Sequence, residues 1–183
     1  IDEIALNPKV CKYIDIPIQH CNDDILKRMG RRGNKKQIVE VINKLRKKVD
    51  GITIRTTLIT GFPGETDDQH LETEQFIKDM KFDRLGVFAY SQEENTPAAQ
   101  MPGQIDEEVK QKRLEMLMFA QSEVVEELSM EKVGSVIDVL VEGFDAVSEQ
   151  YYGRSEADTI DIDPKIFFES ENSLEPGDFA RVK

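Results

Sequence analysis

The run TLITGFPGET, residues 57–66, has residue types and spacing that could hold a ligand. Gly61 and Gly64 bracket a turn in which the backbone can approach a bound molecule, because glycine carries no side chain. Thr66 is a typical N-cap for the helix that follows, and helix N-termini attract phosphate and other anions. The pattern predicts a strand, a ligand-holding turn and a helix, in that order.

Polar residues at the ends of the other predicted strands are the remaining candidates. Functional groups of parallel strand-helix folds gather at the carboxyl ends of the strands. This rule selects Gln19, His20, Arg55, Thr57, Glu65, Tyr90 and Ser91. Arg55 has a second explanation, since an arginine in an apolar strand must be paired whatever its function.

The sequence predicts no metal site. Cys11 and Cys21 lack the CxxC spacing of such sites, and His20 beside Cys21 supplies too few ligands, so His20 is predicted to be structural. His70 lies among acidic residues in the first turns of a helix, and we expect it to be solvated. The apolar run at residues 116–119 is predicted to pack in the core.

Three strand-then-helix units must position the candidates. Apolar and β-branched runs predict strands within residues 12–20, 51–65 and 84–91, and amphipathic patterns predict helices within residues 22–45, 66–80 and 106–133. Such alternation predicts a parallel sheet. After Gly134 the pattern has period two, which predicts a small antiparallel barrel. We therefore expect domains at residues 1–131 and 132–183.

Charge is unevenly distributed along the 183 residues, whose formal net charge is −12. Residues 27–48 hold ten Lys or Arg against one acidic residue, whereas residues 132–183 hold five basic against twelve acidic, a balance of −7. This acidity argues against a general nucleic-acid binder, because phosphate contacts need cations. No apolar run is long enough to span a membrane, and two cysteines favour a reducing compartment, so a soluble cytoplasmic protein is expected.

Both ends of the sequence suggest a piece of a longer protein. The chain begins at Ile1 without a methionine and stops at Lys183 directly after DFARVK, an alternating run typical of a strand. We expect the second domain to be truncated at this end.

TLITGFPGET resembles the strand-to-loop signature of radical S-adenosylmethionine enzymes. Together with IPIQH, FAYSQEENTPAA and GRSEAD, it makes nearly the whole chain similar to the methylthiotransferase family. The resemblance implies the last half of a partial (βα)6 TIM-like barrel, followed by a small TRAM-type, OB-like antiparallel β-barrel. The family's CxxxCxxC cysteines, which hold a 4Fe–4S cluster, would belong to a preceding segment.

The resemblance also implies roles for individual residues. Glu65 would fix the turn and Tyr90 would face the reacting centre, while no catalytic residue is assigned. The implied cofactor-binding residues are Gln19, Arg55, Thr57, Gly61, Glu65 and Tyr90. The motif GRSEAD implies that Asp158 binds substrate. Arg31 and Arg32 are further substrate-binding candidates because they flank Gly30 and Gly33 in a loop near the predicted open end of the barrel, where a carboxylate-bearing substrate could meet them.

Two residues depart from the family's pattern. Asn95 stands where the family carries glycine, a change that only stiffens a loop because asparagine tolerates left-handed backbone. Thr57 stands where related enzymes often carry aspartate, so the family's cofactor contact at this position is not carried over unchanged.

The acidic tail bears on the choice of substrate. Some methylthiotransferases act on transfer RNA and others on an aspartate of protein twelve of the small ribosomal subunit. A balance of −7 favours the basic ribosomal protein, and GRSEADTIDID resembles the ribosomal-protein members. The implied full-length enzyme uses S-adenosylmethionine, two 4Fe–4S clusters and an electron donor, and this fragment alone is expected to be inactive.

Two alternatives stay open. One is a transfer-RNA methylthiotransferase, which a basic tail would have supported. The other is a non-catalytic module in which the glycine turn holds a phosphate or nucleotide at a helix N-terminus.

Overall fold

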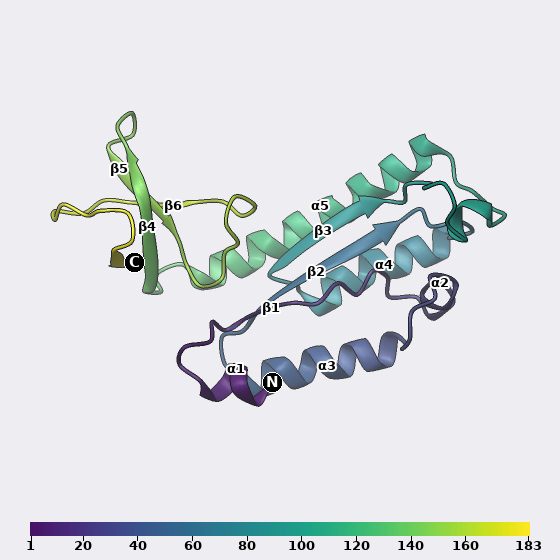
Figure 1. Ribbon diagram of the computed structural model, residues 1–183, viewed down its shortest axis with the longest axis horizontal. Coiled ribbons are helices and arrows are strands. Elements are labelled where there is room, and N and C mark those ends of the chain that lie inside the picture. Colours follow the sequence, from purple (N-terminus) through teal and green to yellow (C-terminus); the bar gives the residue numbers. More distant parts are fainter.

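The computed structural model describes residues 1–183, which form a parallel sheet and an antiparallel sheet joined by one long helix (Figure 1). The parallel sheet has the order β1-β2-β3. Its strands are β1 (Tyr13–Asp15), β2 (Thr53–Thr60) and β3 (Arg84–Ala89). The predicted alternation of strands and helices is therefore confirmed.

Five α-helices and one short 3-10 helix accompany the strands. They are α1 (Asp2–Leu6), α2 (Asp23–Arg28), α3 (Lys35–Lys48), α4 (Asp67–Met80), η1 (Ala98–Gln100) and α5 (Glu107–Lys132). Side-chain caps set where several helices begin: Asn34 with Gln37, and Thr66 with Gln69, form reciprocal capping boxes. The short helix α1 was not predicted from the sequence.

The main hydrophobic core lies between the parallel sheet and helices α3, α4 and α5. Alternate residues of β2, among them Ile54 and Leu58, face these helices and are buried. The intervening side chains of β2 and β3 face the opposite side of the sheet, where Phe88 is 61% exposed. Helices thus cover this sheet on one face only, whereas parallel sheets usually carry helices on both.

The antiparallel sheet, which we call the β-domain, follows α5. Its strands are β4 (Ile137–Asp145), β5 (Gln150–Arg154), β6 (Ile166–Phe168) and β7 (Phe179–Val182), in the order β6-β5-β4-β7. Val139, Val141 and Phe168 form its separate small core. The predicted change to an antiparallel β-structure is confirmed. No helix of the chain is long and apolar enough to cross a membrane.

Predicted placements on two helices are wrong. His70, expected in solvent, is 4% exposed because it shares the inward stripe of α4 with Thr73 and Ile77. Met116, Met118 and Phe119, expected in the core, are exposed on α5, whose inward stripe runs through Leu117 instead. Helix periodicity explains both cases, since residues three or four apart share a face.

Candidate functional site

The turn between β2 and α4 lies at the carboxyl end of the central strand. Gly61 and Gly64 have φ angles of +72° and +76°, which side-chain-bearing residues rarely adopt. A Cβ atom on Gly61 would also overlap the side chain of Lys110, and one on Gly64 would overlap the guanidinium of Arg28. Both glycines are therefore required by conformation and by close packing.

Glu65 closes the turn from inside the protein. Its side chain is fully buried, and its carboxylate accepts hydrogen bonds from the Gly61 amide at 2.7 Å, Arg113 Nη1 at 2.7 Å and His20 Nε2 at 3.0 Å. Burial by itself raises the pKa of Glu65, but the bonds from His20 and Gly61 and the charge of Arg113 hold the pKa below its ordinary value. Glu65 is thus an ionised carboxylate that organises the turn.

His20 donates to Glu65 as a neutral imidazole. The backbone amide of Asn22 donates to His20 Nδ1 at 2.9 Å, so the ring proton must lie on Nε2, which faces Glu65. Both ring nitrogens are therefore occupied by protein groups, and no cluster of residues able to hold a metal ion is present. The structural role predicted for His20 agrees with this geometry.

The turn's own amides are largely used within the protein. The Gly61 amide donates to Glu65, the Gly64 amide to the carbonyl of Gly103 at 2.7 Å and the Glu65 amide to the carbonyl of Phe62 at 2.9 Å. A buried carboxylate also stands in the turn. Both facts disfavour a phosphate held by this loop, because a phosphate needs free donors and no neighbouring negative charge.

Two cations of α5 complete the site and were missed in the sequence. Lys110 Nζ donates to the carbonyl of Tyr90 at 3.0 Å, and Arg113 bridges Glu65 and Asp67. In a charged helix they look like surface residues. Their spacing from the buried Leu117, seven and four residues, is the signal that could have revealed their inward face.

Gln19 and Tyr90 extend the site to the neighbouring strands. Gln19, with φ of +70°, pairs beside β2, where its amide donates to the Thr57 carbonyl at 2.9 Å and its carbonyl accepts from Ile59 at 2.7 Å. The Tyr90 amide donates to the Thr60 carbonyl at 2.9 Å, and its buried hydroxyl has no hydrogen-bond partner. The structure thus brings Gln19, Gly61, Glu65 and Tyr90 to one end of the sheet, whereas Thr57 is the fifth of eight residues in β2 and lies within the strand.

Arg55 does not end its strand, and this placement from the sequence is wrong. It is the third of eight residues in β2, opposite Asp15 on β1 and Arg84 on β3, near the amino ends of the strands. Its guanidinium forms an ion pair with Asp163, and its Nε donates to the Tyr13 hydroxyl at 2.7 Å. These contacts agree with the second explanation given for Arg55, an arginine that is paired within the protein.

Asp158, predicted to bind substrate, also lies at this opposite end. Its carboxylate accepts a hydrogen bond from Arg84 Nη2 at 2.6 Å. Burial raises the pKa of Asp158, yet hydrogen bonds from Ser155 and Arg84 lower the pKa overall. Asp158 is therefore occupied by a partner within the chain.

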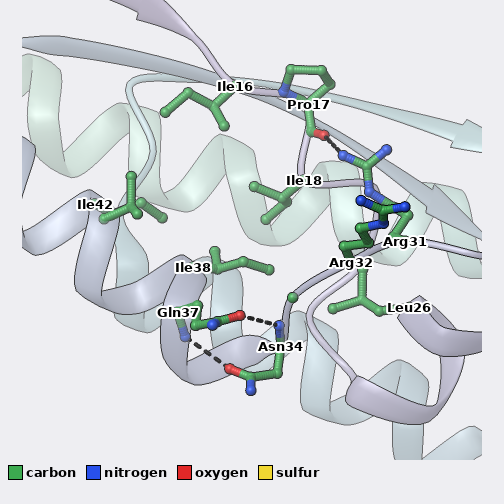
Figure 2. Close-up of a pocket in the computed structure, with 12 residues that line it drawn as sticks. Ile16, Pro17, Ile18, Leu26, Arg31, Arg32, Asn34, Gln37, Ile38 and Ile42 are labelled. Atoms are coloured by element: carbon green, nitrogen blue, oxygen red, sulfur yellow. Dashed lines mark hydrogen bonds between the residues drawn. The ribbon is translucent and has the colours of Figure 1, made fainter.

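Arg31 and Arg32 line a small pocket between α3 and the segment after β1 (Figure 2). Arg31 Nη2 donates to the Pro17 carbonyl at 2.8 Å, while apolar side chains such as Ile18 and Ile42 form the floor. The cavity holds about 210 Å³, less than the roughly 300 Å³ at which small-molecule sites begin. Both arginines remain exposed at its rim.

Comparison with known proteins finds family matches to two parts of the chain. Residues 1–77 match the Radical SAM superfamily, and residues 133–183 match the TRAM domain. The ribosomal protein uS12 methylthiotransferase RimO of Clostridium botulinum (strain Langeland) is 48% identical over 183 residues, which are 100% of this chain and 41% of that protein.

Proteins of the same name from other bacteria are equally similar. The one from Pelotomaculum thermopropionicum is 49% identical over 180 residues, which are 98% of this chain and 40% of that protein. The one from Desulforudis audaxviator is 48% identical over 183 residues, which are 100% of this chain and 40% of that protein. The chain therefore spans about two fifths of the length of these relatives.

Proposed function

From the premise that this chain belongs to the Radical SAM superfamily and carries a TRAM domain, we propose that it is part of a methylthiotransferase acting on an aspartate of ribosomal protein uS12. The observation that carries the proposal is identity of 48% across all 183 residues, including both the turn and the β-domain. We place the domain boundary between residues 131 and 132, one residue before α5 ends. The first domain would be the last half of a (βα)6 barrel.

S-adenosylmethionine would lie at the carboxyl ends of β1–β3. The fit rests on the open face of the sheet beside Thr57 and on the unpartnered Tyr90 hydroxyl, which leaves a buried polar atom free for a ligand. Gln19, Thr57, Gly61 and Tyr90 would contact the cofactor, and Glu65, with Lys110 and Arg113, would hold the turn. The cofactor supplies the radical chemistry when bound, and these residues bind and orient it.

The residues of this chain do not fit an iron–sulfur cluster. Cys11 is exposed, whereas Cys21 is buried beside Thr73, and burial raises the pKa of its thiol to about 11. A cluster ligand must be a thiolate. The two 4Fe–4S clusters and the electron donor of the proposed enzyme would therefore engage other parts of the full-length protein, and this chain alone would be inactive.

The β-domain would recruit the basic protein. Of the twelve acidic residues in 132–183, Asp158 and Asp163 are paired with arginines of the parallel sheet, which leaves ten against five cations. This excess attracts a basic protein and repels RNA phosphate, so the proposal excludes transfer RNA as the substrate. A ribosomal-protein substrate places the reaction in the cytoplasm.

Binding of the 183-residue chain to uS12 and, separately, to transfer RNA tests the proposal. We expect binding to uS12 that weakens steadily as salt rises, and no binding to RNA at physiological salt. Neutralising Glu169, Glu171 and Glu175 to glutamine should weaken uS12 binding severalfold, since each is an exposed charge of the β-domain.

The matched control removes three exposed charges from α5 instead, at Glu115, Glu126 and Glu131. This control has the same net charge as the β-domain variant, but its lost charges lie outside the β-domain. Its affinity for uS12 should therefore stay close to that of the parent. Equal losses in both variants would mean that net charge alone governs binding, and binding to RNA in place of uS12 would overturn the proposed substrate.

A further inference from the structure

A loop of the β-domain reaches across to the parallel sheet. This loop, residues 155–163, is called the acidic loop here because it carries Glu156, Asp158, Asp161 and Asp163. Asp158 accepts from Arg84 at 2.6 Å, and Asp163 forms ion pairs with both Arg55 and Arg84. The loop thereby joins groups more than seventy residues apart in the sequence, with separations of 74 and 108 for the two hydrogen-bonded pairs.

The two carboxylates and the two arginines that form these ion pairs are largely shielded from water. Asp158 and Asp163 are each 6% exposed, Arg55 is 13% exposed and Arg84 is 25% exposed. Arg55 and Arg84 lie directly opposite each other on neighbouring strands. Two like charges at such a position repel, so the two carboxylates are needed to balance them.

Hydrogen bonds within the acidic loop orient the carboxylates of Asp158 and Asp163. Ser155 donates to Asp158 through its amide at 3.0 Å and its hydroxyl at 2.6 Å, and the Thr159 amide donates to Asp163 at 2.7 Å. A second polar contact joins the Thr159 and Tyr13 hydroxyls at 3.0 Å. The acidic loop is therefore shaped by its own hydrogen bonds to present both charges to the sheet.

Apolar packing contributes little to this contact. The core of the parallel sheet and the core of the β-domain share no residue. The two isoleucines of the acidic loop, Ile160 and Ile162, are 56% and 69% exposed instead of packing on the sheet. The connection after α5 is also exposed at Val133 and Val136, so it does not anchor the β-domain.

We propose that the acidic loop is an electrostatic latch that sets the orientation of the β-domain on the parallel sheet. Asp158 and Asp163 of the loop, with Arg55 and Arg84 of the sheet, are positioning residues that fix the arrangement of the two domains. This inference is independent of the substrate proposed above.

A distance between two spin labels on the 183-residue chain tests the latch. Leu71→Cys on α4 and Val147→Cys in the β4–β5 turn give exposed label sites, and Cys11→Ser removes the exposed native thiol. The parent should give one narrow distance distribution by pulsed electron paramagnetic resonance. The double variant Arg55→Gln with Arg84→Gln should broaden the distance distribution about twofold or more. Without the ion pairs, the contact between the β-domain and the parallel sheet opens more readily, so the two labels sample more distances.

Two further variants separate charge from structure. Arg55→Lys with Arg84→Lys keeps both charges and should restore most of the narrow distribution, whereas Arg181→Gln removes an ion pair inside the β-domain, with Asp138, and should leave the distribution unchanged. An unchanged distribution in the glutamine variant would overturn the proposal, since something other than charge would then fix the orientation.

A milder variant covers the case in which the arginine changes unfold the chain. Asp158→Asn with Asp163→Asn preserves side-chain shape, and the amide of Thr159, which donates to Asp163, should then exchange its hydrogen about tenfold faster or more. Amides of β2 serve as the internal reference and should not change. Unaltered exchange at Thr159 would count against the latch.

Discussion

Glu65 shows how one buried carboxylate can organise several backbone and side-chain groups. Glu65→Gln removes the charge that faces Arg113 while keeping the side-chain shape. We expect the free energy of unfolding to fall by about 3 kcal/mol, because the buried Arg113 loses its buried partner and keeps only the exposed carboxylate of Asp67. Urea unfolding at pH 7 measures this loss.

The control for this change is Glu74→Gln, which breaks a partly exposed ion pair with Lys78 on α4. Such pairs contribute little to stability, because solvent screens the two charges. If Glu65→Gln cost no more than this control, the turn would not depend on the charge of Glu65.

His70 predicts how stability responds to mild acid. Burial lowers the pKa of His70 below its ordinary value of 6.5, and both ring nitrogens lack hydrogen-bond partners. Folding therefore favours the neutral ring. The contribution of His70 to the free energy of unfolding is complete above pH 6.5 and is lost as the pH falls through the lowered pKa of the folded state. His70→Gln should lose less stability than the parent between pH 7 and pH 5, as measured by urea midpoints. Parallel curves for the two proteins would contradict this assignment.

Single residues also show what the sequence could and could not reveal. Asn95 has φ of +64°, as expected for a residue in the place of a family glycine. Arg55 was misplaced because its partner Asp163 lies 108 residues away, beyond the reach of any local pattern. The partner of Arg113 was hidden for the same reason, since Glu65 lies 48 residues earlier, although the spacing of Arg113 from Leu117 could have revealed its inward face.

At the scale of elements, local signals were sufficient. Strand and helix periodicity predicted all three strand-helix units, and Thr66 marked where α4 begins. Thr66→Ala removes the hydroxyl that accepts from the Gln69 amide at 3.3 Å, and we expect a loss of about 1 kcal/mol in unfolding free energy. Thr66→Ser keeps the acceptor and should lose much less. A similar loss for serine and alanine would show that the cap does not stabilise α4.

At the scale of the whole molecule, sequence patterns were insufficient. Periodicity predicted two domains and their types, but it carries no information on how two folded units meet. The acidic loop belongs to a motif that suggested substrate binding, yet two of its carboxylates contact Arg55 and Arg84 of the other domain. Domain docking depends on contacts between distant residues, which only the three-dimensional structure brings together.

The length of helix α5 sets the distance between the Glu65 turn and the β-domain. Its 26 residues correspond to about 39 Å at 1.5 Å per residue. Near the start of α5, Lys110 binds the Tyr90 carbonyl after β3, and Arg113 binds Glu65 of the β2–α4 turn. The β-domain follows the last turn of α5, on the side where β2 and β3 begin (Figure 1). A partner that touches both the β-domain and the Glu65 turn must therefore bridge tens of ångströms. Free amino acids and short peptides are too small to do so, and a folded protein with a projecting loop has the necessary reach.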